Sequence, residues 1–165
     1  MQLIILVETK SKDGSDCIYL REFFKKFYGG LRGTKLSFIP MNGKTNYFNK
    51  ENEIISFKKI YSGESKVIIA IDIDNPELLL DQKTINKNIV NYCKNKGYEL
   101  VWFNKTIENV FLGKIVKRDK NKIALNYSKN QLINKVRIDS FSKNDFNECR
   151  QGESNLKTII DKLLD

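Results

Sequence analysis

Histidine is absent from the 165 residues of this chain, and this absence excludes several kinds of active site. Without it, neither a Ser-His-Asp nor a Cys-His nucleophile can form, and the usual zinc hydrolase centres lose their ligands. Cys17, Cys93 and Cys149 lie far apart, which indicates neither a disulfide framework nor a zinc site. An enzyme with this sequence would have to use carboxylates, lysines and a bound metal.

Long apolar runs are also missing, because none approaches the roughly 20 residues that a membrane span needs. The start, Met1 to Glu8, has no basic leader and reaches an acid at once, so we expect a strand rather than a signal peptide. With 41% hydrophobic and 30% charged residues, the chain suits one compact core. We expect a single cytoplasmic domain over residues 1–165.

Acidic residues are outnumbered by basic ones, 20 against 29, which gives a net charge of +9. The excess is concentrated between Gly113 and Arg150, where ten basic and four acidic residues leave a surplus of six. Such a stretch favours a polyanionic partner such as nucleic acid. The alternative is a solvated, lysine-rich surface with no partner.

Strand and helix patterns alternate along the first two thirds of the chain. Short apolar runs predict buried parallel strands at Leu3–Val7, Lys35–Pro40, Lys66–Ile71 and Glu99–Phe103. Helical spacing of apolar residues predicts helices after Asp16, around 54–61 and over Thr84–Lys96. This order predicts an α/β fold with a mainly parallel sheet of about four strands and helices on both faces.

The last third has a weaker pattern. Alternation over Lys122–Tyr127 predicts a strand, with residues 119–122 as the turn of a hairpin. Ser154 is a candidate cap for a final helix with Leu156, Ile159, Ile160 and Leu163 on one face. We therefore expect an extension at residues 113–165 that ends in a helix.

Acidic residues stand at the ends of two predicted strands. Glu8 follows the first strand, and Asp72 and Asp74 follow the third. Alternation along a strand would point Asp72 and Asp74 the same way, and neighbouring strands would bring Glu8 to them. Oxygen ligands of this kind suit Mg²⁺ or Mn²⁺. The alternatives are an acidic loop after the third strand and a surface or helix-capping role for Glu8.

The order of these motifs resembles the Toprim family, the catalytic module of topoisomerases and bacterial primases, which has a Rossmann-like fold. An apolar strand ends in Glu8, Asp16 opens the first helix, Gly43 follows the second strand, and Asp72-Ile73-Asp74 forms a D-x-D at the end of the third. The resemblance covers residues 1–112. The loop between Glu8 and Asp16 is longer than in many Toprim domains.

The small size and the segment at 101–108 look most like the RloB-like and OLD-type Toprim nucleases, in which an acidic residue after the fourth strand joins the metal site. Glu108 is the matching residue, although a glutamate at the start of a helix also favours the helix dipole by itself. In these relatives, nuclease activity serves defence against phage or mobile elements, often beside a partner ATPase.

Candidate phosphate contacts come from the basic residues. Lys44, in the glycine turn after the second strand, is the first choice, and Lys114, Lys117 and Arg118 come next. Trp102 and Phe103 could stack on a base, but both fall in a predicted core strand.

Three functions remain open at this stage. The first is a Mg²⁺-dependent Toprim-type nuclease that uses Glu8, Asp72 and Asp74, with Glu108 as a further metal ligand. The second is an inactive Toprim module that binds nucleic acid or a partner ATPase. The third is a phosphoacceptor or phosphatase-like domain with Asp72 as the nucleophile.

Overall fold

Four parallel strands form one sheet in the computed structural model, which describes residues 1–74, 80–144 and 150–165. The strands lie in the order β2-β1-β3-β4. Their bounds are Gln2–Val7 for β1, Lys35–Pro40 for β2, Ser65–Asp72 for β3 and Glu99–Phe103 for β4. The predicted α/β, Rossmann-like architecture with its four-stranded parallel sheet is confirmed.

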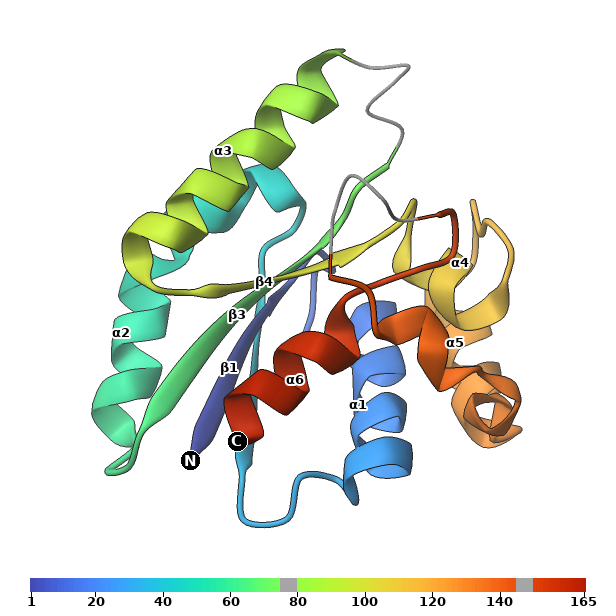
Figure 1. Cartoon of the computed structure of the whole chain (residues 1–165), viewed down its shortest axis with the longest axis horizontal. Coiled ribbons are helices and arrows are strands. Elements are labelled where there is room, and N and C mark those ends of the chain that lie inside the picture. The colour runs from blue at the N-terminus through green and yellow to red at the C-terminus, as the bar shows by residue number, and fades with distance from the viewer. Residues whose placement is uncertain (75–79, 145–149) are drawn as a thin grey trace.

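Helices cover both faces of this sheet (Figure 1). The helices are α1 Ser15–Tyr28, α2 Glu51–Ile60, α3 Leu80–Lys96, α4 Ile107–Leu112, α5 Lys120–Lys129 and α6 Leu156–Leu164, with 3-10 turns η1 Lys44–Lys50, η2 Leu132–Lys135 and η3 Ile138–Phe141. In Figure 1, α2 and α3 lie on one side of the strands, and α1, α4, α5 and α6 lie on the other.

Both faces are apolar because the strands carry hydrophobic side chains at consecutive positions. In β1, Leu3, Ile5 and Val7 belong to the core shared with α1, whereas Ile4 and Leu6 belong to the core shared with α2 and α3. A strand buried on both faces has this continuous apolar pattern. The sheet therefore forms the middle layer of three.

Aromatic side chains hold the last third of the chain to α1. The Phe23 ring lies 4.8 Å from that of Phe141, and the Tyr19 ring lies 5.0 Å from that of Tyr127. The segment after Gly113 therefore packs into the same apolar core as α1.

The predicted strand at Lys122–Tyr127 is wrong, because these residues belong to α5. Ile123, Ala124 and Tyr127 share helical spacing, and the last two are buried against the core. Asp119, which was expected in a hairpin turn, precedes α5 with a φ of 54°. Ile123, Leu125 and Tyr127 alternate as in a strand, but Leu125 is exposed on the helix, and six residues are too few to separate period 2 from period 3.6.

Two predicted helix starts need correction. Gly14, not Asp16, is the N-cap of α1, and Asp16 lies in the first helical turn. Asn155, not Ser154, is the N-cap of α6, although the Ser154 hydroxyl still accepts a hydrogen bond from the Leu156 amide at 3.2 Å. The helices themselves are confirmed.

The segment before α6 lies along the outer edge of β4. The Asn155 side chain accepts a hydrogen bond from the Trp102 amide at 3.0 Å and donates one to the Leu100 carbonyl at 2.9 Å. Ser154 donates to the Trp102 carbonyl at 2.6 Å. One amide side chain thus pairs with β4 in the way that a neighbouring strand would.

The two buried cysteines, Cys17 and Cys93, are free thiols, and Cys149 lies outside the described residues. None of the helices in the described ranges is long and apolar enough to cross a membrane.

Candidate functional site

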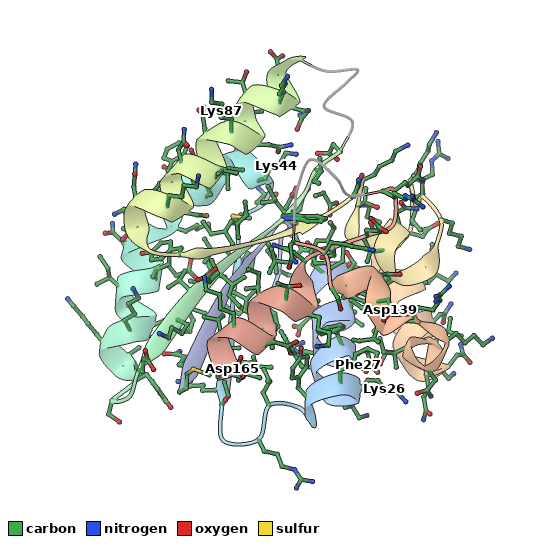
Figure 2. The ribbon with its side chains drawn as sticks, viewed as in Figure 1. Lys26, Phe27, Lys44, Lys87, Asp139 and Asp165 are labelled. Atoms are coloured by element: carbon green, nitrogen blue, oxygen red, sulfur yellow. The ribbon has the colours of Figure 1, made fainter. Side chains whose placement is uncertain are left out.

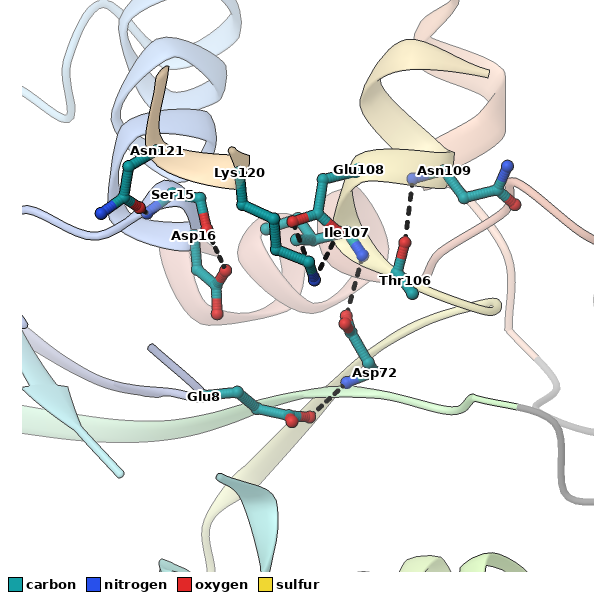
Figure 3. A network of polar contacts seen from close by, with 10 residues as sticks. All are labelled: Glu8, Ser15, Asp16, Asp72, Thr106, Ile107, Glu108, Asn109, Lys120 and Asn121. Carbon is teal, nitrogen blue, oxygen red and sulfur yellow. Dashed lines mark hydrogen bonds and ion pairs between the residues drawn. The ribbon is translucent and has the colours of Figure 1, made fainter. Parts of the chain in front are cut away.

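Glu8 and Asp72 meet at the carboxyl ends of adjacent parallel strands. Glu8 directly follows β1, and Asp72 is the last residue of β3. The Asp72 amide donates a hydrogen bond of 2.7 Å to the Glu8 carboxylate, and the Ile107 amide donates one of 2.8 Å to Asp72 (Figure 3). Each acid therefore uses one carboxylate oxygen to bind backbone.

Asp16 and Glu108 reach the same place from the first turns of α1 and α4. Glu108 is fully buried at 0% exposure, and its charge and that of Asp16 both act on Asp72. Figure 3 shows these side chains around one space, with Glu8 below them. We call Glu8, Asp16, Asp72 and Glu108 the carboxylate cluster.

Burial and mutual repulsion raise the proton affinity of this cluster. Burial is the main cause that raises the pKa of Glu8 to about 7 and that of Asp16 to about 6. The pKa of Asp72 lies well above its ordinary value because of burial and then the charges of Glu8, Asp16 and Glu108. In the absence of a bound cation, the charged form of these carboxylates is therefore disfavoured.

Lys120, in the first turn of α5, is a cation that faces the cluster. Its ammonium lies 3.1 Å from one Glu108 oxygen and 3.2 Å from the other. Burial would lower the pKa of Lys120, but the charges of Glu108, Asp72 and Asp16 raise it instead. Sequence patterns missed Lys120, because the start of α5 was expected to be a hairpin turn.

Asp74 stands apart from the position predicted for it. β3 ends at Asp72, and Asp74 has a φ of 61°, so alternation along a strand does not extend to Asp74. Its carboxylate instead accepts a hydrogen bond of 2.6 Å from Lys44. Its charge still acts on Glu8.

Lys44 lies near the cluster but is committed to contacts within the chain. Only 5% of its surface is exposed, and its ammonium also donates to the Asp72 carbonyl at 2.7 Å. Lys44 is the first residue of η1, and in the view of Figure 2 it lies closer to the middle of the molecule than Lys87 of α3.

Gly43 allows the turn that presents Lys44. Its φ of 101° lies in a region that favours glycine, and its amide donates to the Glu8 carbonyl at 2.9 Å. The loop after β2 is thereby fixed to the end of β1. The lysine expected near the acidic residues is there, but Asp74 and the Asp72 carbonyl occupy its ammonium.

The other expected phosphate contacts lie farther along the chain. Lys114, Lys117 and Arg118 are exposed in the segment between α4 and α5, and no hydrogen bond or ion pair of the described residues joins them to the carboxylate cluster. Trp102 and Phe103 are both 2% exposed and pack in the cores, so neither offers a face to a base.

The donor set fits a hard divalent cation in its chemistry, because every member of the cluster offers carboxylate oxygens. Burial and mutual repulsion disfavour the charged form of these carboxylates, and such an ion would offset both. As the side chains stand, however, no three acidic or cysteine residues within 1–74, 80–144 and 150–165 form a ready metal-binding group. Binding would therefore require side-chain adjustment.

Comparisons of the chain with protein-family models, curated proteins and solved structures found no match. The functional argument therefore depends on the site itself.

Proposed function

We propose that this protein is a Mg²⁺- or Mn²⁺-dependent nuclease of the Toprim type. The observation that carries the proposal is the convergence of Glu8, Asp16, Asp72 and Glu108 from four separate segments at the carboxyl ends of β1 and β3. Ligand sites of open parallel sheets lie at this end. The order of acidic motifs along the chain also resembles that of Toprim domains.

Glu8, Asp72 and Glu108 are the residues that would hold the cation, with Asp16 beside them. A bound divalent ion would polarise a phosphodiester oxygen and stabilise the negative charge that develops on the phosphoryl oxygens. Asp74 would act at a distance, because Lys44 holds its carboxylate while its charge reaches Glu8.

Where Glu8 does not hold the cation, it has the proton affinity that a general base or acid needs near neutral pH. Its pKa of about 7 results mainly from burial, and catalytic groups work best when their pKa lies near the working pH. The Asp72 amide fixes one of its oxygens at 2.7 Å, which holds the carboxylate in one orientation.

A second function is favoured by the Lys120 contact. Because an ammonium already pairs with Glu108 at 3.1 Å, the cluster could be internally neutralised and serve only to shape a binding module. Such a module would bind nucleic acid or a partner ATPase without cleaving anything.

A cleavage assay separates the candidates. Labelled single-stranded and duplex RNA and DNA are incubated with Mg²⁺, Mn²⁺ or EDTA, using the parent protein, Glu8→Gln, Asp72→Asn and the exposed control Asp13→Asn. We expect metal-dependent cleavage by the parent and the control, and a loss of about 100-fold or more in the two cluster variants. Circular dichroism and thermal melting confirm that each variant is folded.

The other outcomes point elsewhere. Binding without cleavage, unchanged in Glu8→Gln and Asp72→Asn, would favour the inactive module. Hydrolysis of a phosphomonoester without cleavage of any polymer would favour the phosphatase-like alternative. Cleavage that persists in EDTA would contradict the metal-dependent nuclease.

A further inference from the structure

A groove of about 560 Å³ opens directly beside the carboxylate cluster. It lies between the loop that follows β1 and the first turn of α5. Its walls are formed by Thr9, Lys10, Ser11, Gly14, Ser15, Asp119, Lys120, Asn121 and Lys122. It is not lined by Lys44, Lys114, Lys117 or Arg118, the residues predicted from sequence to contact phosphate.

The walls are polar and mainly basic. Lys10, Lys120 and Lys122 supply three positive charges against one negative charge from Asp119. Three hydroxyl side chains, those of Thr9, Ser11 and Ser15, add to the polarity of the walls, although the Thr9 and Ser15 hydroxyls donate within the chain, to the Ser11 carbonyl and to Asp16. Lysines and hydroxyls together suit a phosphate group better than an apolar ligand.

Two helices also begin at this groove. Ser15 opens α1 and Lys120 opens α5, and the Ser15 amide donates to the Asn121 side chain at 2.9 Å, which fixes the two helix starts together. Helix N-termini carry partial positive charge, so both reinforce the charge of the lysines.

The loop wall of the groove is held by its own contacts. The Gly14 amide donates to the Ser11 carbonyl at 3.1 Å, and the Thr9 hydroxyl donates to the same carbonyl at 3.2 Å. A Cβ atom at Gly14 would lie 2.5 Å from the Cβ of Thr9, so the loop can close on itself only with glycine there. The long loop between Glu8 and Asp16 is thus a folded wall of the groove.

Two residues of the groove contact the cluster. Ser15 lines the groove and donates its hydroxyl to Asp16 at 3.2 Å, while Lys120 lines the groove and pairs with Glu108 at 3.1 Å. A group bound in the groove would therefore lie next to the carboxylates, separated from them by these two side chains.

We infer that this groove binds a phosphate of the nucleic-acid strand next to the phosphate that is cleaved. The inference rests on the proposed nuclease function and names how that site holds its substrate. Lys10 and Lys122, both exposed, contact the bound phosphate, and Lys120 faces both this phosphate and the cluster. A strand held here would run from the groove across the carboxylates.

Binding in EDTA tests the groove without any cleavage. Fluorescence anisotropy gives the dissociation constant of single-stranded oligonucleotides with a 5′-phosphate or a 5′-hydroxyl, at several salt concentrations. The variants are Lys10→Ala and Lys122→Ala, and the matched control is Lys129→Ala, an exposed lysine in the last turn of α5.

We expect each groove variant to bind about 3- to 10-fold more weakly at low salt and to reduce the salt slope by about 0.7. In the control Lys129→Ala, both the dissociation constant and the salt slope should change less than in the groove variants. A 5′-phosphate preference that is lost in both variants would assign the groove to a terminal phosphate, and an equal loss for both oligonucleotides would assign it to an internal one. Variants that bind like the parent or like the control would overturn the inference.

The two proposals fail separately. Oligonucleotide binding that depends on Lys10 and Lys122, without metal-dependent cleavage, would support phosphate binding in the groove and contradict the nuclease function. If the parent cleaves and Lys10→Ala and Lys122→Ala cleave equally well, the nuclease function is supported and phosphate binding in the groove is contradicted.

Discussion

The backbone amide of Asp72 donates a 2.7 Å hydrogen bond to the carboxylate of Glu8, a residue 64 positions earlier in the chain. This contact connects the ends of β1 and β3 and brings two acidic side chains together. One of them, Glu8, has a pKa of about 7 because it is buried. The raised pKa values of the proposed site follow from the burial of these carboxylates close to one another.

Stability in the absence of metal should fall as pH rises from about 4.5 to 7. The folded state holds the Glu8 proton up to about pH 7, whereas the unfolded chain releases it near 4.5, so the folded state binds more protons between these values. Glu8→Gln should remove part of this fall, on the order of 1–3 kcal/mol.

Urea denaturation in EDTA at pH 5, 6, 7 and 8 measures this effect. Glu51, Glu153 and Asp161 have lowered pKa values and titrate below this range, whereas the raised pKa values of Asp16 and Asp72 add to the fall in the parent and in Glu8→Gln alike. Asp13→Asn, at a carboxylate whose side chain is 93% exposed, is the control. A Glu8→Gln profile parallel to that of the parent would contradict the prediction.

Replacement of Lys120 should make the protein more dependent on a divalent cation. In Lys120→Ala, Glu108 stays fully buried without its partner, which should cost about 1–3 kcal/mol in the absence of metal. Mg²⁺ should then raise the melting temperature of the variant more than that of the parent, because the ammonium no longer competes for the cluster.

Thermal melts with Mg²⁺, and with Na⁺ at the same ionic strength, separate specific binding from screening. Lys129→Ala should respond as the parent does. If Mg²⁺ stabilises neither the parent nor Lys120→Ala beyond the Na⁺ control, the proposed metal centre is wrong.

Loss of Lys44 should destabilise the fold itself. Lys44→Ala removes a buried ammonium that binds both the Asp72 carbonyl and Asp74, and the expected cost is about 1–3 kcal/mol in urea denaturation. The exposed pair between Lys66 and Glu64 provides the comparison, since Lys66→Ala should cost less than about 0.5 kcal/mol. Equal losses in the two variants would mean that burial of Lys44 adds nothing.

Asn155→Ala should loosen the edge of β4. Its side chain bonds to the Trp102 amide and the Leu100 carbonyl, so the change should cost about 1–3 kcal/mol and speed hydrogen exchange at the Trp102 amide. Asn130→Ala removes an exposed hydrogen bond to the Asn126 carbonyl and should have little effect. Unchanged exchange at Trp102 would show that other groups protect this edge.

The strands could be predicted from sequence because burial on both faces leaves continuous apolar runs such as that of β1. Lys35–Pro40 and Glu99–Phe103 were placed at their observed bounds. The α5 region could not be placed, because Ile123, Leu125 and Tyr127 alternate as in a strand. The helix instead buries Ala124 and Tyr127, three positions apart, and leaves Leu125 exposed.

The candidate site was predictable only in part for a similar reason. Acidic residues at strand ends, such as Glu8 and Asp72, can be recognised in the sequence because they follow apolar runs. The order of the strands in the sheet then brings them together. The Lys120 contact with Glu108 depends on how α5 packs on α1, which no local pattern encodes. Asp74 was misplaced because the end of β3 and the positive φ that follows depend on the Lys44 contact and on backbone pairing with Lys105.

The side chain of Asn155 and the backbone around it also determine how the sheet can grow. Trp102 and Leu100 already bond to this amide, and Ser154 bridges to Phe103 from the same side. An incoming strand from another molecule would have to displace this segment before it could pair with β4. Asn155 and Ser154 therefore occupy the edge of β4 that strand addition would need.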